Sequence, residues 1–307
     1  MPKSWAVKGL RRKQRVRKAA RIILRAKARE TLAYDDLVRV GDVEAIHDMR
    51  VNSKRWREAL RLLLPGLPRK SAKAQLARVD ALNDALGVVR ERDVLLQQVE
   101  DLLAQLPPEA QDAARGALEP LRERGAAERD GHHCRLVEFL DGWREKRYGK
   151  EFARFARALR RWRGRRGQAA SRDFARQHLA ACVARVLERE PAARDPEAFL
   201  AFHRLRLAVK RLRYTIEPFW TILPRSVRAA YPPICSLAET MGKTHDCDVL
   251  AETLRRETEG HDWRTAALQP LCEVLAADRR RLYQQSAELL DQVVSSGLAQ
   301  GLANALG

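Results

Sequence analysis

The sequence predicts an all-α fold. Long stretches of its 307 residues consist of Ala, Leu, Arg and Glu, which favour helices, whereas only 6% of the residues are aromatic. Apolar residues recur at intervals of three and four, and the alternating β-branched runs that would indicate strands are nearly absent. A chain of this length fits two compact domains or one duplicated domain, either of which can bury a sizeable core.

Proline, glycine and capping residues separate the expected helices. Gly41 interrupts the first helical pattern, and Asp42 is a suitable N-cap for the helix that follows. Later, Asp195 is expected to cap a helix that has Pro196 in its first turn. The helices whose ends the sequence indicates cover about residues 7–38, 43–63, 69–106, 109–144, 171–190 and 261–294, with further breaks at Pro224, at Pro232-Pro233 and at Gly260.

A densely basic segment marks the expected boundary between two halves. Its residues 160–167 read Arg-Arg-Trp-Arg-Gly-Arg-Arg-Gly, and the like charges and glycines indicate a solvated linker. The prediction is therefore a first helical repeat over 7–163, a second over 171–294, and a flexible tail over 295–307.

The formal net charge of +19 points to an anionic partner, because so much uncompensated charge repels itself. Nucleic acid, an anionic membrane surface and polyphosphate all qualify. The first thirty residues contain twelve Lys and Arg and no apolar run long enough for a signal peptide, and no segment approaches the about 20 apolar residues of a membrane span. Five cysteines without a CxxC pair suggest neither disulfides nor zinc, so we expect a cytoplasmic protein without metal or cofactor.

An internal repeat carries the main functional signal. Residues 47–57, HDMRVNSKRWR, align without gaps on residues 203–213, HRLRLAVKRLR, and share the pattern HxxRxxxKRxR. A second pair follows in the same order, with residues 86–94, LGVVRERDV, matching residues 241–249, MGKTHDCDV. Two ordered matches indicate that the chain is a duplication.

Helical geometry turns the repeated motif into a column of cations. Positions 47, 50, 54, 57 and 61 recur at steps of three and four and therefore share one stripe of a helix. In the second copy positions 203, 206, 210 and 213 do the same, with Glu217 at the end of the row. An apolar stripe lies about 100° away, so each column borders a buried face and suits the wall of a groove. The first column is about 21 Å long at 1.5 Å per residue.

A column of like charges favours a bound anion over an ordinary solvated face. Solvated helix faces mix signs, since like charges at i,i+4 are mildly destabilising, and here the same exception occurs in both copies. Arg offers a planar fork for phosphate, Lys a flexible point charge, and His one or two donors. Because phosphate favours the charged imidazolium, binding is expected to strengthen as pH falls through the His range.

Other interpretations remain open at this stage. The basic runs 8–29 and 144–166 could form a nucleic-acid-binding surface, although the aromatic residues from Trp143 to Trp162 have helical spacing and favour core packing over base stacking. A phosphohydrolase ranks third, because a cationic column repels divalent metal. The adjacent His132, His133 and Cys134 cannot all reach one ion. Asp93 and Asp248 are interpreted as structural residues, which cap or pair with the Arg and Lys columns so that those side chains are aimed.

The duplicated HxxRxxxKRxR helices, each followed by a Gly-containing helix that ends in Asp-Val, resemble the CHAD family, the conserved-histidine α-helical domain. The resemblance extends over about residues 7–294. It implies two four-helix bundles, related by a pseudo-twofold axis, around a basic central channel that binds inorganic polyphosphate without catalysis. It also implies association with polyphosphate granules, and some relatives attach to polyhydroxyalkanoate granules.

The family pattern also implies which side chains line that channel. They are His47, Arg50, Lys54, Arg55, Arg57, His203, Arg206, Lys210, Arg211 and Arg213. The two walls are unequal, because Glu217 stands in the second column where the first has Arg61. Relatives often carry a fused triphosphate tunnel domain rich in acidic strands, which this sequence lacks, so a stand-alone binding module is expected.

Overall fold

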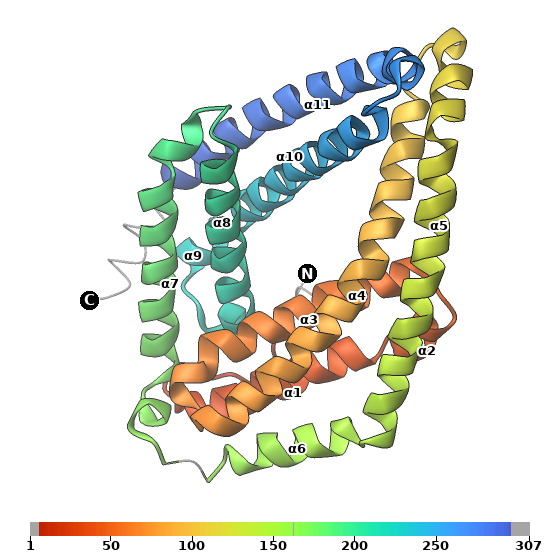
Figure 1. Cartoon of the computed structure of the whole chain (residues 1–307). Coiled ribbons are helices and arrows are strands. Elements are labelled where there is room, and N and C mark those ends of the chain that lie inside the picture. The colour runs from red at the N-terminus through yellow and green to blue at the C-terminus, as the bar shows by residue number, and fades with distance from the viewer. Residues whose placement is uncertain (1–5, 162, 296–307) are drawn as a thin grey trace.

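The chain is almost entirely helical. A computed structural model describes residues 6–161 and 163–295 (Figure 1). Within these residues the only extended pairing is one antiparallel bridge between Arg15 and Ala170, so the predicted all-α class is confirmed. None of the helices in these residues is long and apolar enough to cross a membrane.

The helices of the first half follow the expected order. Asp42 caps the third of them as predicted, its side chain accepting a hydrogen bond from Ala45 N at 2.7 Å. The elements are α1 (Val16–Leu32), α2 (Asp35–Arg39), α3 (Val43–Leu63), η1 (Leu64–Gly66), α4 (Arg69–Leu103), α5 (Pro108–Glu145) and α6 (Tyr148–Ala158).

The single helix expected over 7–38 is wrong, because it divides into α1 and α2 and starts only at Val16. Backbone bonds with a distant segment explain the late start: Val16 N donates to Ala169 O at 2.9 Å, and Ser171 N donates to Gln14 O at 2.8 Å. These bonds hold the residues before Val16 out of the helix.

The second half repeats this sequence of long helices. Its elements are η2 (Arg165–Gln168), α7 (Ser171–Arg189), η3 (Pro191–Arg194), α8 (Phe199–Phe219), η4 (Trp220–Ile222), α9 (Arg225–Ala229), α10 (Tyr231–Thr258) and α11 (Asp262–Ser295). The start expected at Asp195 is wrong. Asp195 accepts from Glu197 N at 2.9 Å in a local turn, and α8 begins only at Phe199.

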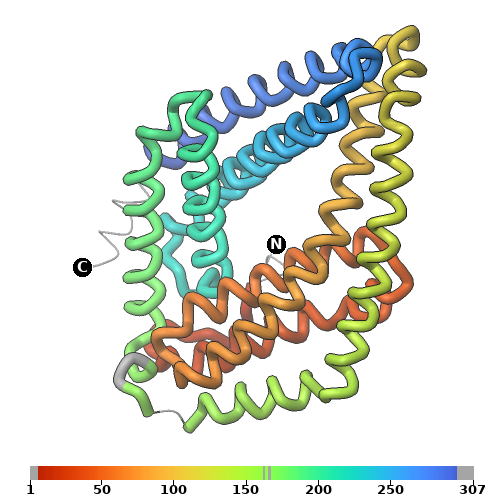
Figure 2. The backbone as a smooth tube through the Cα atoms, viewed as in Figure 1, coloured from red at the N-terminus to blue at the C-terminus, as the bar shows by residue number. Residues whose placement is uncertain are grey.

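Neighbouring helices pack into a ring (Figure 1). In the first half α3 packs against α1 and α4, and α4 against α5; in the second half α8 packs against α7 and α10, and α10 against α11. Contacts of α3 with α8 and of α5 with α11 join the two halves, as the tube in Figure 2 shows. The two helices that carry the repeated motif, α3 and α8, therefore meet each other directly.

The hydrophobic cores cross between the halves. The largest cluster contains Trp56 of α3 together with Leu205 and Leu212 of α8, and a second cluster joins α4 and α5 to α10 and α11. The division into repeats over 7–163 and 171–294, with the pseudo-twofold bundles, stays a prediction. Of the tail expected over 295–307, residues 296–307 lie outside the described residues.

Aromatic residues of the basic middle segment belong to the core, as predicted. Phe152 lies edge-on to the buried Trp56 ring at 4.9 Å between centroids, and Tyr148 packs on Trp143 at 4.1 Å. Phe155 is also buried. Trp162 lies outside the described residues. These rings fasten α6 to α3 and α5 instead of offering a surface for stacked bases.

Candidate anion-binding site

The repeated motifs lie on α3 and α8, and the predicted apolar stripes anchor both helices. Met49 and Trp56 of α3 and Leu205 and Leu212 of α8 are essentially inaccessible to solvent. Burial of each such side chain contributes about 1.5–3 kcal/mol, so the orientation of each helix about its axis is well determined. The cationic columns then lie at the edge of this core, where the side chains are only half-buried.

Four cations come together where α3 meets α8. They form what we call the central cluster: Arg50, Lys54, Arg206 and Lys210. The pKa of Lys54 is lowered to about 7, first by burial and then by the positive charges of Arg50, Lys210, Arg57 and Arg206. Burial, followed by Arg206, Arg50 and Arg57, lowers the pKa of Lys210 to about 8. The cations of the opposite helix thus lower the pKa of each lysine, which means that the two columns face one another.

The two arginines of the cluster present unused donors. Nε of Arg50 and Nε of Arg206, at equivalent positions of the motif, are buried and have no hydrogen-bond partner among the residues that the structure describes. A buried donor without a partner costs about 1–3 kcal/mol, so both matched positions are suited to an acceptor from outside the chain. Glu91, 3.5 Å from Arg50 Nη2, is a weak partner, being largely exposed. Gly87 leaves room beside the guanidinium of Arg50, since an added Cβ would lie 3.8 Å from it.

The motif histidines extend the cluster at its two ends. Burial lowers the pKa of His47, and Arg90 on α4 adds to the effect. His203 packs on His245 of α10 at 4.9 Å between ring centroids, and burial followed by Arg206 and Lys210 lowers its pKa. Both motif imidazoles are therefore biased toward the neutral form, in which each donates one hydrogen bond.

Not every predicted site residue is free to bind an anion. Arg55 and Arg213 both contact the buried carboxylate of Glu217, at 2.9 Å and 3.3 Å. Tyr231 Oη donates to the same carboxylate at 2.9 Å. We call these four residues the Glu217 network. It pairs two of the predicted cations with one carboxylate and links α3 to α8.

The remaining predicted residues lie toward the periphery of the cluster. Arg57 has acidic neighbours, Glu58 at 3.2 Å and Asp80 at 3.9 Å, although its charge still reaches both lysines. Arg61, expected to continue the first column, pairs with the same two carboxylates. Arg211 is exposed, whereas its neighbour Lys210 is half-buried.

Residues of the second sequence match also face the cluster, although they lie outside the HxxRxxxKRxR pattern. Arg90 acts on His47, and its counterpart His245 packs on His203. Asp246 raises the pKa of Arg206, against the larger lowering by burial, as Glu91 does for Arg50. These residues occupy matching positions of the aligned segments 86–94 and 241–249, and that match was the signal in the sequence that could have identified them.

A clamp holds the turn before α3. Asp93 pairs with Arg129 of α5 at 3.0 Å, and Arg129 Nη2 donates to Gly41 O at 2.9 Å. One helical turn further along α5, His133 Nε2 bonds Val38 O at 2.8 Å. Gly41 has a φ of +82°, which favours glycine, and both α5 side chains lie within 4 Å of a Cβ built there. The start of α3 is thereby fixed from outside.

The same clamp recurs before α8. Asp248 pairs with Arg279 of α11 at 2.9 Å, and Arg279 Nη2 donates to Pro196 O at 3.0 Å. One turn on, Tyr283 Oη donates to Ala193 O at 3.1 Å. Asp93 and Asp248 therefore have a structural role, as expected, but their partners lie on α5 and α11 and not in the Arg and Lys columns. Each one instead holds an arginine that positions the turn leading into a motif helix.

Metal chemistry finds no support in the described part of the chain. No three His, Cys, Asp or Glu side chains among these residues lie close enough to hold an ion. His133 is used in the clamp, and His132 lies 2.7 Å from Arg135.

The fold and site define an all-helical protein in which two equivalent helices present facing cations. The sequence matches the CHAD domain family over residues 22–255, and the chain belongs to this family. The CHAD family is associated with polyphosphate. A comparison with curated proteins finds no match.

Solved structures show the same fold. The structure is similar to the CHAD domain from the plant Ricinus communis, with a TM-score of 0.65 and 22% identity, covering 99% of this chain and 96% of that one. It is also similar to PptA from Streptomyces chartreusis, with a TM-score of 0.64 and 17% identity, covering 91% of this chain and 99% of that one.

Proposed function

We propose that the protein binds inorganic polyphosphate, without catalysis, between the facing columns of α3 and α8. The observation that carries the proposal is the central cluster, in which two arginines and two lysines of separate helices come together with unused donors on both arginines. Burying like charges side by side is costly unless a counterion joins them. A phosphate chain supplies that counterion along its whole length.

A linear polyanion fits better than a single phosphate. The contributing positions run from His47 to Arg57 on α3 and from His203 to Lys210 on α8, and Arg90 and His245 flank the two histidines. Successive phosphate groups accept charge-assisted hydrogen bonds from successive turns, each contributing about 1.5–3 kcal/mol. The family association supports the choice of polyphosphate among linear polyanions. We further propose a cytoplasmic location, at polyphosphate or polyhydroxyalkanoate granules, as the family resemblance implies.

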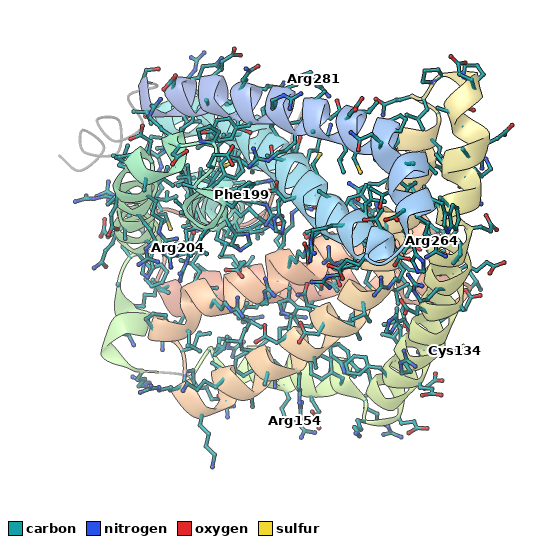
Figure 3. All side chains as sticks on the ribbon, turned by 45° about the horizontal axis from the view of Figure 1, so that its top comes forward. Cys134, Arg154, Phe199, Arg204, Arg264 and Arg281 are labelled. Carbon is teal, nitrogen blue, oxygen red and sulfur yellow. The ribbon has the colours of Figure 1, made fainter. Side chains whose placement is uncertain are left out.

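Nucleic acid is the second candidate, favoured by cations on the outer surface. Arg25 and Arg29 of α1 and Lys150, Arg154 and Arg157 of α6 are exposed, and no ion pair neutralises them within the described residues. Figure 3 shows Arg154 at the outer edge of the ring. A phosphate backbone could lie over such a surface through sequence-independent contacts.

A competition experiment separates these candidates. The protein is titrated at about 150 mM salt with long-chain polyphosphate, short-chain polyphosphate and duplex DNA, and affinities are measured by calorimetry. We expect long-chain polyphosphate to bind at least tenfold more tightly than DNA, because a thin, flexible chain can contact both facing columns at once. Equal affinity for DNA would defeat the specific proposal and leave a general polyanion binder.

The non-catalytic part of the proposal has its own test. Phosphate release from polyphosphate is followed with and without divalent metal, and we expect no release above the rate without protein. Metal-dependent release that disappears when Arg50 and Arg206 are replaced by Gln would show that the site is catalytic.

A further inference from the structure

A second cationic feature lies where the chain's N-terminal segment meets the start of α7, at the left of Figure 1. Arg172 N donates to Arg12 O at 3.0 Å, and Ser171 N and Ser171 Oγ both donate to Gln14 O at 2.8 Å. These bonds join segments that are far apart in sequence. They place the side chains of Arg12 and Arg172 beside the same pocket.

The pocket has an apolar floor and an arginine rim. Its volume is about 240 Å³, and its lining is Arg12, Arg172, Ala175, Arg176, Leu179, Ile222, Leu223 and Pro224. The aliphatic side chains of α7 and of the segment after α8 are buried, whereas Arg12 and Arg172 are exposed and Arg176 is half-buried. An apolar interior beneath three positive charges suits a ligand with two chemically different ends.

The charge on the rim is available to a ligand. Arg12 and Arg176 have no ion pair within the residues that the structure describes, and Arg172 contacts only its exposed neighbour Asp173, at 3.3 Å. Among the described residues, no acidic side chain lines the pocket. A larger pocket of about 680 Å³ between α10 and α11 differs in this respect, because Asp248, Glu252 and Arg255 give its lining both signs.

We propose that this pocket binds a small amphiphilic anion, a carboxylate or phosphate head on a short hydrocarbon tail. The head pairs with the arginine rim, and the tail covers the apolar floor. The volume corresponds to about eight water molecules and is below the about 300–1,000 Å³ of pockets for drug-sized ligands, so the tail is of medium length. No residue of the lining belongs to the cationic columns of α3 and α8, and the proposal is independent of polyphosphate binding.

Calorimetry of the full chain with octanoate tests the proposal. From butanoate to octanoate we expect roughly fourfold tighter binding per methylene, as a tail entering an apolar site predicts. Neutral 1-octanol should bind at least tenfold more weakly than octanoate. Octyl phosphate is compared with octanoate, and the tighter of the two assigns the head group. Acetate or inorganic phosphate binding as well as octanoate would overturn the proposal, as would 1-octanol binding equally well.

Variants locate the site. Replacing Arg172 and Arg176 by Gln should weaken octanoate binding at least tenfold, while Arg185→Gln, an exposed position further along α7, should leave it unchanged. Equal loss in the Arg185→Gln protein would reduce the effect to general charge and contradict the pocket. The Arg50→Gln/Arg206→Gln protein, altered only in the central cluster, should bind octanoate normally. Loss there would overturn the independence of the two sites, whatever happens to polyphosphate binding.

Discussion

The central cluster and the Glu217 network are built from the same motif but solve the problem of buried charge in opposite ways. In the Glu217 network, Arg55 and Arg213 share a carboxylate that is 1% exposed. In the central cluster, Lys54 precedes Arg55 by one residue and meets mainly other cations. The first arrangement is complete in the free protein, whereas in the second the proposed polyphosphate supplies the missing anion. A cation in this motif therefore serves the fold or the ligand according to which side of the helix it occupies.

The largest effect is expected from the arginines of the central cluster. Replacing Arg50 and Arg206 by Gln removes charge-assisted hydrogen bonds worth about 1.5–3 kcal/mol each, so polyphosphate affinity should fall at least 100-fold. The matched control replaces the exposed Arg204 of α8 and Arg185 of α7 by Gln, an equal change in charge. Titration of both proteins with long-chain polyphosphate measures the difference. Similar losses in the two would show that net charge, and not the cluster, holds the ligand.

Loss of the carboxylate from the Glu217 network should lower the free energy of unfolding. Glu217→Gln leaves Arg55 and Arg213 buried without their shared counterion, and breaking such a buried pair costs about 3–5 kcal/mol. Urea unfolding followed by circular dichroism measures the loss. Glu239→Gln is the control, since that acid pairs with Arg213 from an exposed position. If both variants lose the same stability, the network is no more important than a surface ion pair.

Replacing a lysine of the central cluster should raise the stability of the free protein and lower its affinity for polyphosphate. Lys54→Met removes a charge that its neighbours repel and keeps an apolar stem of similar length. We expect the free protein to gain about 1–3 kcal/mol, while polyphosphate affinity falls about tenfold. Thermal unfolding with and without polyphosphate measures both effects. A destabilised Lys54→Met protein would mean that Lys54 has a counterion in the free state, and the contrast with Arg55 would fail.

The sequence predicted the helices and their faces better than the roles of single cations. Periodicity was sufficient for α3 and α8, because the apolar stripe that determines each orientation is local. The difference between Lys54 and Arg55 was not predictable, since Glu217 is 162 residues away along the chain. The start of α1 depends likewise on pairing with the segment around Ala170. Both errors concern partners brought close only by the fold.

The smallest effect is expected from pH, and it tests whether the lysines act as buried like charges. With pKa values of about 7 and 8, Lys54 and Lys210 are partly neutral near pH 7.5, and a bound polyanion raises both values. Binding then takes up protons, so affinity should weaken about two- to fivefold from pH 7 to pH 8.

The pH range differs from the one expected for histidine, because burial lowers the pKa values of His47 and His203. The free protein should show the opposite trend. The unfolded chain holds its lysine protons up to about pH 10.4, so these two groups make the folded state more stable as pH rises from about 7. Calorimetry in buffers of different ionisation enthalpy detects the proton uptake directly. Binding without proton uptake, and with the same affinity at pH 7 and pH 8, would show that the lysines are already fully charged in the free protein.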